Sequence, residues 1–166
     1  MEILSLQNSH IIFGNYFYER LTNLLKINNY SSVFILTDSH TYEFCLPRFL
    51  ENLITDKRIK IIEVDAGEEN KNIDTCTAIW QTLTDLGADR KTLFITLGGG
   101  MITDLGGFVA ATFKRGIDCI NVPTSLLAMV DASVGGKTGI DFNGFKNEIG
   151  AFSVPKLVGI DTEFLA

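Results

Sequence analysis

Short apolar segments alternate along the chain with stretches in which apolar residues are spaced as on one face of a helix. The apolar segments predict strands buried on both faces, which is typical of parallel sheets. Val33–Leu36 is a continuous apolar run of this kind, and further strands are predicted at Ile59–Val64, Leu93–Leu97, Cys119–Val122 and Leu157–Ile160. Before them, Ile3–Leu6 and Ile11–Phe13 predict a short strand pair on either side of the polar Gln7–His10.

The intervening stretches carry apolar residues three or four positions apart, which predicts helices. These helices are predicted at Tyr16–Ile27, Phe44–Leu53, Ile73–Leu86, Met101–Phe113 and Ser125–Val130. Strands that alternate with helices of this kind indicate parallel pairing. The sequence therefore predicts an α/β fold: a doubly wound, mainly parallel sheet with helices on both faces, Rossmann-like in plan.

Length and composition limit the class of protein. The 166 residues correspond to about one domain, and 46% of them are hydrophobic. The longest apolar runs fall well short of the ~20 residues that a membrane-spanning helix needs. The first ten residues lack the basic and apolar regions of a signal peptide. We therefore expect a cytoplasmic domain with no membrane partner.

The charges and cysteines exclude further classes. The chain has 14 Lys and Arg against 20 Asp and Glu, a net charge of −6, with no basic run. Nucleic-acid-binding proteins usually carry a basic patch, because neutralising phosphates supplies most of their affinity, so no nucleic-acid partner is expected. Cys45, Cys76 and Cys119 are odd in number and widely spaced, which excludes a disulfide framework and a Cys-type zinc site.

The most informative local pattern is the junction Gly98-Gly99-Gly100 between a predicted strand and a predicted helix. Glycines let the backbone approach a ligand closely, and the start of the helix offers unpaired N–H groups to an anion. The dinucleotide pattern G-x-G-x-x-G is not satisfied, because Thr103 stands at its last position. A nucleotide phosphate is nevertheless favoured over a purely structural turn. Asp104, in the first helical turn, is either a dipole-compensating carboxylate or a ligand acceptor.

Other polar residues follow the predicted strands. Asp38 ends one strand, where a carboxylate can accept hydrogen bonds from a ribose diol. Glu68, Glu69 and Lys71 follow the next strand. Taken singly, such residues are more often caps and solvated loop charges.

Three cations beside Gly or Asn are candidate anion ligands: Arg115, Lys137 and Lys146. Lys137 lies in the glycine-rich Val134–Gly139, which is not a P-loop, because Asp131 stands where that motif needs glycine. His10 and His40 lie far from these motifs, so no Ser/His/Asp triad is predicted.

Taken in order, these blocks resemble the amino-terminal half of the 3-dehydroquinate synthase family of sugar-phosphate cyclases. Five blocks carry the resemblance, and a looser match extends upstream through Asp38 and residues 67–71. The five blocks are GGGMITDLGGF from Gly98, KRG from Lys114, VPTSLL from Val122, VDASVGGKT from Val130 and KNEIGAF from Lys146.

The resemblance implies an NAD-binding domain over residues 1–166 of an enzyme that converts 3-deoxy-D-arabino-heptulosonate 7-phosphate to 3-dehydroquinate and phosphate in the shikimate pathway. NAD would oxidise a ring alcohol transiently, which lets phosphate leave, and would then be regenerated. A homodimer and a divalent metal, zinc or cobalt, are implied for the full-length enzyme. The family's metal ligands come from a helical domain that follows, so the C-terminal helical metal-binding domain is absent from this chain and no metal ligand is assigned.

The resemblance also implies roles for single residues. The NAD pyrophosphate and nearby groups would be held by Gly99, Gly100, Met101, Ile102, Thr103 and Asp104. Around the adenosine half would lie Asp38, Glu68 and Lys71, and near the middle of the cofactor Thr124 and Ser125. Where cofactor and substrate meet, we expect Asp131 and Lys146. The anionic groups of the substrate would be bound by Lys137, Asn147 and Arg115, the last across a dimer interface.

The sequence departs from the family's pattern at a few positions. Ser125 stands where threonine is common, Ala132 where serine is common and His40 where asparagine is frequent. Two other functions stay open: a sister cyclase of the inosose or valiolone type, and a non-catalytic nucleotide-binding module. Iron-dependent alcohol dehydrogenases share the general plan, but the GGK and KN blocks point away from them.

Overall fold

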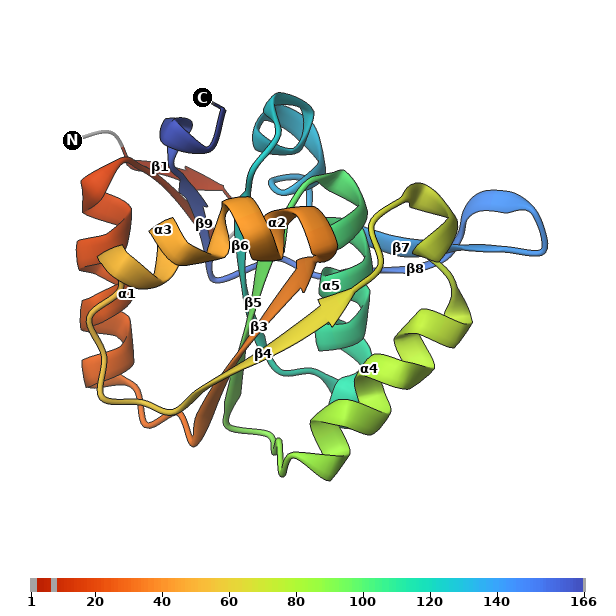
Figure 1. Cartoon of the computed structure of the whole chain (residues 1–166), viewed down its shortest axis with the longest axis horizontal. Helices are drawn as coiled ribbons and strands as arrows, with labels where there is room; N and C mark the ends of the chain where they lie inside the picture. The colour runs from red at the N-terminus through yellow and green to blue at the C-terminus, as the bar shows by residue number, and fades with distance from the viewer. Residues whose placement is uncertain (1–2, 7–8, 166) are drawn as a thin grey trace.

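The chain folds around one twisted sheet, shown nearly edge-on in Figure 1. The structure, a computed structural model, describes residues 3–6 and 9–165, so Gln7 and Asn8 of the predicted polar turn lie outside the described residues. Among these, seven strands form the sheet in the order β1-β2-β9-β6-β5-β3-β4. They are β1 (Ile3–Leu6), β2 (Ser9–Phe13), β3 (Ser32–Asp38), β4 (Ile59–Val64), β5 (Thr92–Gly98), β6 (Asp118–Pro123) and β9 (Leu157–Ile160).

Across the sheet, every pair of neighbouring strands in the order β2-β9-β6-β5-β3-β4 is parallel, and β1 pairs antiparallel with β2. The predicted mainly parallel sheet and the short N-terminal strand pair are therefore confirmed. Helices connect the strands: α1 (Asn15–Ile27), α2 (Ser39–Phe44), α3 (Leu46–Asn52), α4 (Ile73–Asp85) and α5 (Gly100–Thr112). Shorter helical turns are η1 (Glu68–Asn70), η2 (Phe113–Arg115), the π-helical η3 (Ala128–Ala132) and η4 (Thr162–Leu165). No described helix is long and apolar enough to cross a bilayer.

Each face of the sheet packs against its own pair of helices. In β3, Val33 and Ile35 pack with α1 and α3, whereas Phe34 and Leu36 pack with α4 and α5. This alternation follows from the two-residue period of a strand. Because both faces are covered, the central strands are mostly apolar, which is the pattern that the sequence shows. The prediction of helices on both faces is confirmed (Figure 1).

The predicted helix Phe44–Leu53 is wrong in its boundaries. Two helices meet at Cys45, and the first begins at Ser39. Asp38 caps this helix, because its carboxylate accepts the Thr41 N–H at 2.8 Å. The Thr41 hydroxyl in turn accepts the Asp38 N–H, which completes a capping box. Pro47, in the first turn of α3, has no N–H to donate, so the chain starts a new helix there. Similarly, the predicted helix Ser125–Val130 is helical only from Leu126 and ends in the π-helical η3.

A second, two-stranded sheet was not predicted. β7 (Lys137–Phe142) and β8 (Phe145–Phe152) form an antiparallel hairpin that projects beyond α4 and α5 (Figure 1). The loop predicted over Val134–Gly139 therefore ends in a strand. The Asn143-Gly144 turn has φ of 52° and 80°, and positive φ at both positions is the type I′ geometry that Asn-Gly favours in hairpins.

Helix α5 lies between the main sheet and this hairpin. A Cβ on Gly106 would overlap the Thr96 side chain of β5, and one on Gly107 would overlap the Thr138 side chain of β7. Glycine disfavours helices by about 1 kcal/mol relative to alanine, so the pair is explained by close packing on two sides. Consequently α5 is buried around most of its surface.

Candidate functional site

The carboxyl ends of four parallel strands lie side by side. Asp38 pairs with Val64, and Gly98 pairs with Pro123. From β3 the chain passes outward to β4 and then crosses to β5 on the other side, so the strand order reverses at the β3–β5 pair. Ligands of doubly wound sheets bind outside such a switch point. The polar residues that were predicted from strand ends are therefore brought to this edge.

The start of α5 is open toward this edge. Its helical hydrogen bonds begin with the Thr103 N–H to the Gly99 carbonyl at 3.0 Å, so the N–H groups of Gly100, Met101 and Ile102 precede the ladder. Within the described residues no side chain caps this end. The Ile102 side chain is buried in the core, which leaves only its backbone for a ligand. Unpaired N–H groups and the positive end of the dipole favour an anion here.

The turn after β6 faces this helix start. A Cβ on Gly99 would lie 3.5 Å from Ser125 Oγ, and one on Gly100 would lie 3.6 Å from Ala132 Cβ. Thr124 holds the turn in place, since its N–H donates to the Gly98 carbonyl at 2.9 Å. The two glycines thus border a cradle that side chains would fill. The predicted pyrophosphate contacts fit this shape.

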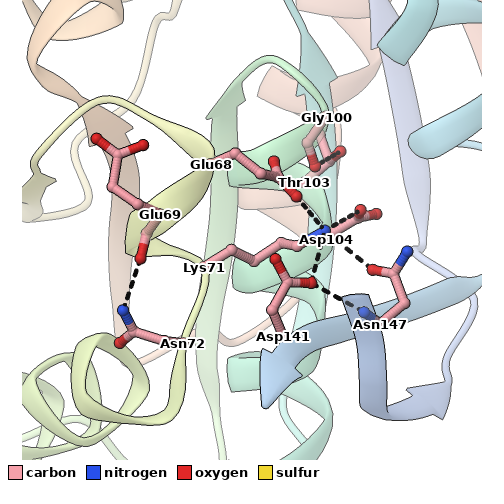
Figure 2. Close-up of polar contacts among 9 residues, drawn as sticks. All are labelled: Glu68, Glu69, Lys71, Asn72, Gly100, Thr103, Asp104, Asp141 and Asn147. Carbon is pink, nitrogen blue, oxygen red and sulfur yellow. Dashed lines mark hydrogen bonds and ion pairs between the residues drawn. The ribbon is translucent and has the colours of Figure 1, made fainter. Parts of the chain in front are cut away.

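A buried lysine links the strand edge to the hairpin. Lys71 is only 4% exposed, and its Nζ lies 2.8 Å from Glu68 Oε1, 2.9 Å from Asn147 Oδ1 and 3.4 Å from Asp104 Oδ2. Asp141 Oδ1 lies 3.7 Å away. Figure 2 shows these groups converging on the ammonium from η1, α5, β7 and β8. Burial alone would lower the pKa of Lys71, but the carboxylates outweigh it and raise that pKa, so the lysine stays charged.

Asp104 is under the opposite influence. Its pKa is raised to about 6, mainly by burial and also by the charges of Glu68 and Asp131, against the lowering effect of the Lys71 ammonium. A carboxylate that is difficult to ionise in a cleft is typical of a functional position. The prediction that Asp104 lies in the first turn of the helix is wrong, because α5 begins at Gly100 and its first turn contains no acidic residue. Asp104 instead lines a cavity and contacts the buried Lys71.

That cavity lies between α5, η3 and the hairpin and has a volume of about 530 Å³. Four polar residues of the prediction line it: Asp104, Asp131, Lys137 and Asn147. The rest of its wall comes from Ala132, Gly135, Thr138, Gly139, Gly150, Ala151 and Phe152. A volume of this size suits a small ligand. The hairpin thus forms one wall of the candidate site.

Two predicted cations lie elsewhere. Lys146 is exposed on β8 beside Asn147 and is not part of the cavity wall. Arg115 is exposed in η2, after the C-terminal end of α5, whereas the glycine cradle is at the N-terminal end. A helix of 13 residues spans about 20 Å at 1.5 Å per residue. Arg115 is therefore not brought to the cavity of its own chain, and its role stays a prediction that requires a second copy.

The residues described here do not fit a metal. No group of three or more His, Cys, Asp and Glu side chains in residues 3–6 and 9–165 could hold an ion. The cysteines Cys45, Cys76 and Cys119 are buried and free, and burial raises the pKa of the Cys76 thiol to about 12.

Sequence reasoning missed Asp141 and the glycines of the hairpin. One signal was available, because Phe142-Asn143-Gly144-Phe145 places a type I′ turn between apolar residues. The cluster around Lys71 left no such signal, since its members come from three separate parts of the chain: residues 68–71, residue 104 and residues 141–147.

Comparison with known proteins bears on the site's identity. Residues 61–166 match the family model "3-dehydroquinate synthase N-terminal". The chain is 50% identical over 145 residues to the 3-dehydroquinate synthase of Parabacteroides distasonis, an alignment that covers 87% of this chain. The chain belongs to the 3-dehydroquinate synthase family. It spans 37%, 39% and 41% of the length of three curated members.

Solved structures of sugar-phosphate cyclases have the same fold. A 2-deoxy-scyllo-inosose synthase complexed with carbaglucose-6-phosphate, NAD⁺ and Co²⁺ superposes with a TM-score of 0.81 at 26% identity, covering 94% of this chain and 43% of that one. A 2-epi-5-epi-valiolone synthase from Streptomyces hygroscopicus superposes with a TM-score of 0.80 at 24% identity, covering 100% and 46%. The second likeness shows the fold alone. Family membership agrees with the resemblance seen in the sequence.

Proposed function

We propose that this chain is the NAD-binding half of a 3-dehydroquinate synthase, which converts 3-deoxy-D-arabino-heptulosonate 7-phosphate to 3-dehydroquinate and phosphate. The observation that carries the proposal is the open start of α5 at the switch point of a sheet in a chain of this family. Uncapped N–H groups, a glycine cradle and a polar cavity adjoin there. Bound NAD would supply a reversible oxidation of a substrate alcohol.

The chain's own residues would bind and orient. Gly99 to Ile102 would present N–H groups to the pyrophosphate. Asp38, Glu68 and Lys71 would lie around the adenosine half, where a carboxylate can accept hydrogen bonds from a ribose diol. Thr124 and Ser125 would line the middle of the cofactor. Charged pairs between Lys71 and the carboxylates prearrange this edge, which reduces the ordering cost on binding.

The substrate would lie in the cavity, between cofactor and hairpin. Lys137 and Asn147 line it and would bind an anionic group of the sugar phosphate. Asp131 and Lys146 would lie where cofactor and substrate meet, and Arg115 would bind phosphate from a second copy. The metal would be held by residues of a following helical domain, with no ligand from the described part of this chain. The cytoplasmic location, the homodimer and residues 1–166 as a unit remain predictions.

Calorimetric titration of the 166-residue chain with NAD tests the proposal. We expect saturable heat and a rise in melting temperature. If millimolar NAD produces neither effect, the result counts decisively against an NAD site. Gly100→Ala should keep the melting temperature, because its Cβ finds ordinary contact with Ala132, and should lose NAD. Gly98→Ala is the contrasting variant, because its Cβ would lie 2.6 Å from Ile102 Cβ and would disturb the packing of α5 on β5. That variant should lose stability.

A sister cyclase is the second candidate, since the inosose synthase shares the fold at 26% identity. The 50% identity to a 3-dehydroquinate synthase favours the first. Assaying the longer protein that contains this chain with each sugar phosphate decides between them. Turnover of another sugar phosphate, in preference to the heptulosonate phosphate, would overturn the first candidate.

A further inference from the structure

The hairpin is irregular at the position that carries Lys146 and Asn147. Ile140 pairs with Ile149, and Phe142 pairs with Phe145. One residue of β7, Asp141, therefore stands opposite three residues of β8, 146–148. Such a bulge interrupts the ladder and leaves backbone groups without a strand partner. Bulges near active sites re-aim side chains, and this one contains two predicted ligands.

Asp141 supplies the missing partner. Its Oδ1 accepts the Asn147 N–H at 2.8 Å. Asn147 has a φ of 53°, a left-handed conformation that is uncommon for residues other than glycine, although asparagine adopts it more readily than most. In that conformation the Asn147 side chain points toward Lys71 and accepts from its Nζ at 2.9 Å (Figure 2). A carboxylate thus holds an otherwise costly backbone geometry.

Asp141 is itself fixed from the opposite side of the cluster. Its N–H donates to the Lys71 carbonyl at 2.9 Å, and its Oδ1 lies 3.7 Å from Lys71 Nζ. Both the main chain and the side chain of Asp141 therefore connect the bulge to the turn that follows η1. The turn contributes Lys71 to the edge of the sheet where the cofactor is proposed to bind, whereas the bulge contributes Asn147 to the cavity wall.

We propose that Asp141 is a positioning residue: its carboxylate fixes the Lys146–Asn147 bulge so that Asn147 forms part of the cavity wall and meets Lys71. This inference rests on the proposed function for its consequence, ligand binding, but its geometric part concerns the chain alone. Asp141 acts through Asn147 and Lys71, and it does not line the cavity.

The test uses ¹⁵N-labelled 166-residue chain with Asp141→Ala and Asp141→Asn. The alanine variant removes the acceptor, so amide exchange at Asn147 should accelerate about tenfold, as expected for loss of a hydrogen bond to a charged group. The asparagine variant keeps a side-chain oxygen, so protection should be largely restored. NAD titrated into the same samples should bind about tenfold more weakly to the alanine variant, with most of the affinity restored by asparagine.

Asp89→Ala is the matched control. Asp89 also accepts a backbone N–H, that of Lys91 at 2.9 Å, but in the exposed turn before β5, at the other end of the sheet. This variant should keep the NAD affinity and the Asn147 exchange rate. An effect on NAD equal to that of Asp141→Ala would show that general loss of a turn contact is responsible, and would overturn the proposal.

The two proposals fail separately. If the unmodified chain does not bind NAD, the proposed function fails, while the exchange rate of Asn147 still decides the role of Asp141. If NAD binds equally to the unmodified chain and to Asp141→Ala, or if Asn147 exchange is unchanged in that variant, the positioning role is overturned.

Discussion

The central strands and the β7–β8 hairpin differ in how far their residues are buried and in which interactions stabilise them. All seven residues of β5 are buried, whereas most residues of β8 are exposed. The sheet is held by apolar packing on both faces, and the hairpin by a tight turn, glycine contacts and the charges around Lys71. The hairpin carries much of the candidate chemistry. Residues that must meet a ligand have to stay accessible, so stability and chemistry are assigned to different parts of the chain.

The largest expected effect sharpens this contrast within one residue type. Phe94 of β5 is fully buried, and Phe145 of β8 is 66% exposed. We expect Phe94→Ala to reduce the free energy of unfolding by about 3–5 kcal/mol, because it leaves a core cavity. Phe145→Ala should change it by less than about 0.5 kcal/mol. Urea denaturation measures both, and equal losses would contradict the division.

Lys71 is the place where the two regions meet. Lys71→Met would leave the carboxylates of Glu68, Asp104 and Asp141 without their shared cation, so we expect a loss of about 3 kcal/mol in the free energy of unfolding at pH 7. Lys91→Met, at an exposed turn lysine, is the control and should have little effect. A variant as stable as the unmodified chain would show that the cluster contributes no net stability.

Steric contact between α5 and the hairpin gives a medium effect. A methyl group on Gly107 would overlap Thr138, so Gly107→Ala should cost about 1–3 kcal/mol of stability. Thr138→Ser removes the overlapped methyl but keeps the hydroxyl that donates to the Ala151 carbonyl at 2.8 Å. The double variant should recover most of the loss, and strict additivity in the cycle would argue against direct contact.

The smallest expected effect is an increase in stability, which comes from replacing Asp104 and depends on pH. The folded-state pKa of Asp104 is about 6, above its ordinary 3.8. The folded state therefore binds the proton more tightly, and the stabilising contribution is full below pH ~4 and is lost as pH rises through about 6. Asp104→Asn lacks this loss, so it should be more stable than the unmodified chain by about 1–2 kcal/mol at pH 8. Melting curves at pH 4 and pH 8 check this, and an Asn variant that is less stable at pH 8 would refute it.

Much of the sheet could be predicted from the sequence, because strands that are buried on both faces require apolar runs such as Val33–Leu36. Boundaries were less accurate where side chains intervened, as where the Asp38 cap starts α2 early and Pro47 starts a new helix. The hairpin was missed, since Lys137–Phe142 and Phe145–Phe152 alternate small, charged and apolar residues without a clear period. For the candidate site, the sequence indicated the glycine junction and the candidate cations, but it did not indicate which of these residues lie close together in space.

By itself, the sequence determined the parallel α/β fold, the glycine junction after the third central strand and the order of blocks that marks the family. These properties depend on local spacing, which the chain carries along its length. Only the tertiary structure decided that Lys71 would be buried among three carboxylates, that Asp141 would face the Lys146–Asn147 bulge and that Arg115 would lie at the far end of α5. The physical reason is that burial, charge pairing and distance arise between elements that are far apart in the sequence.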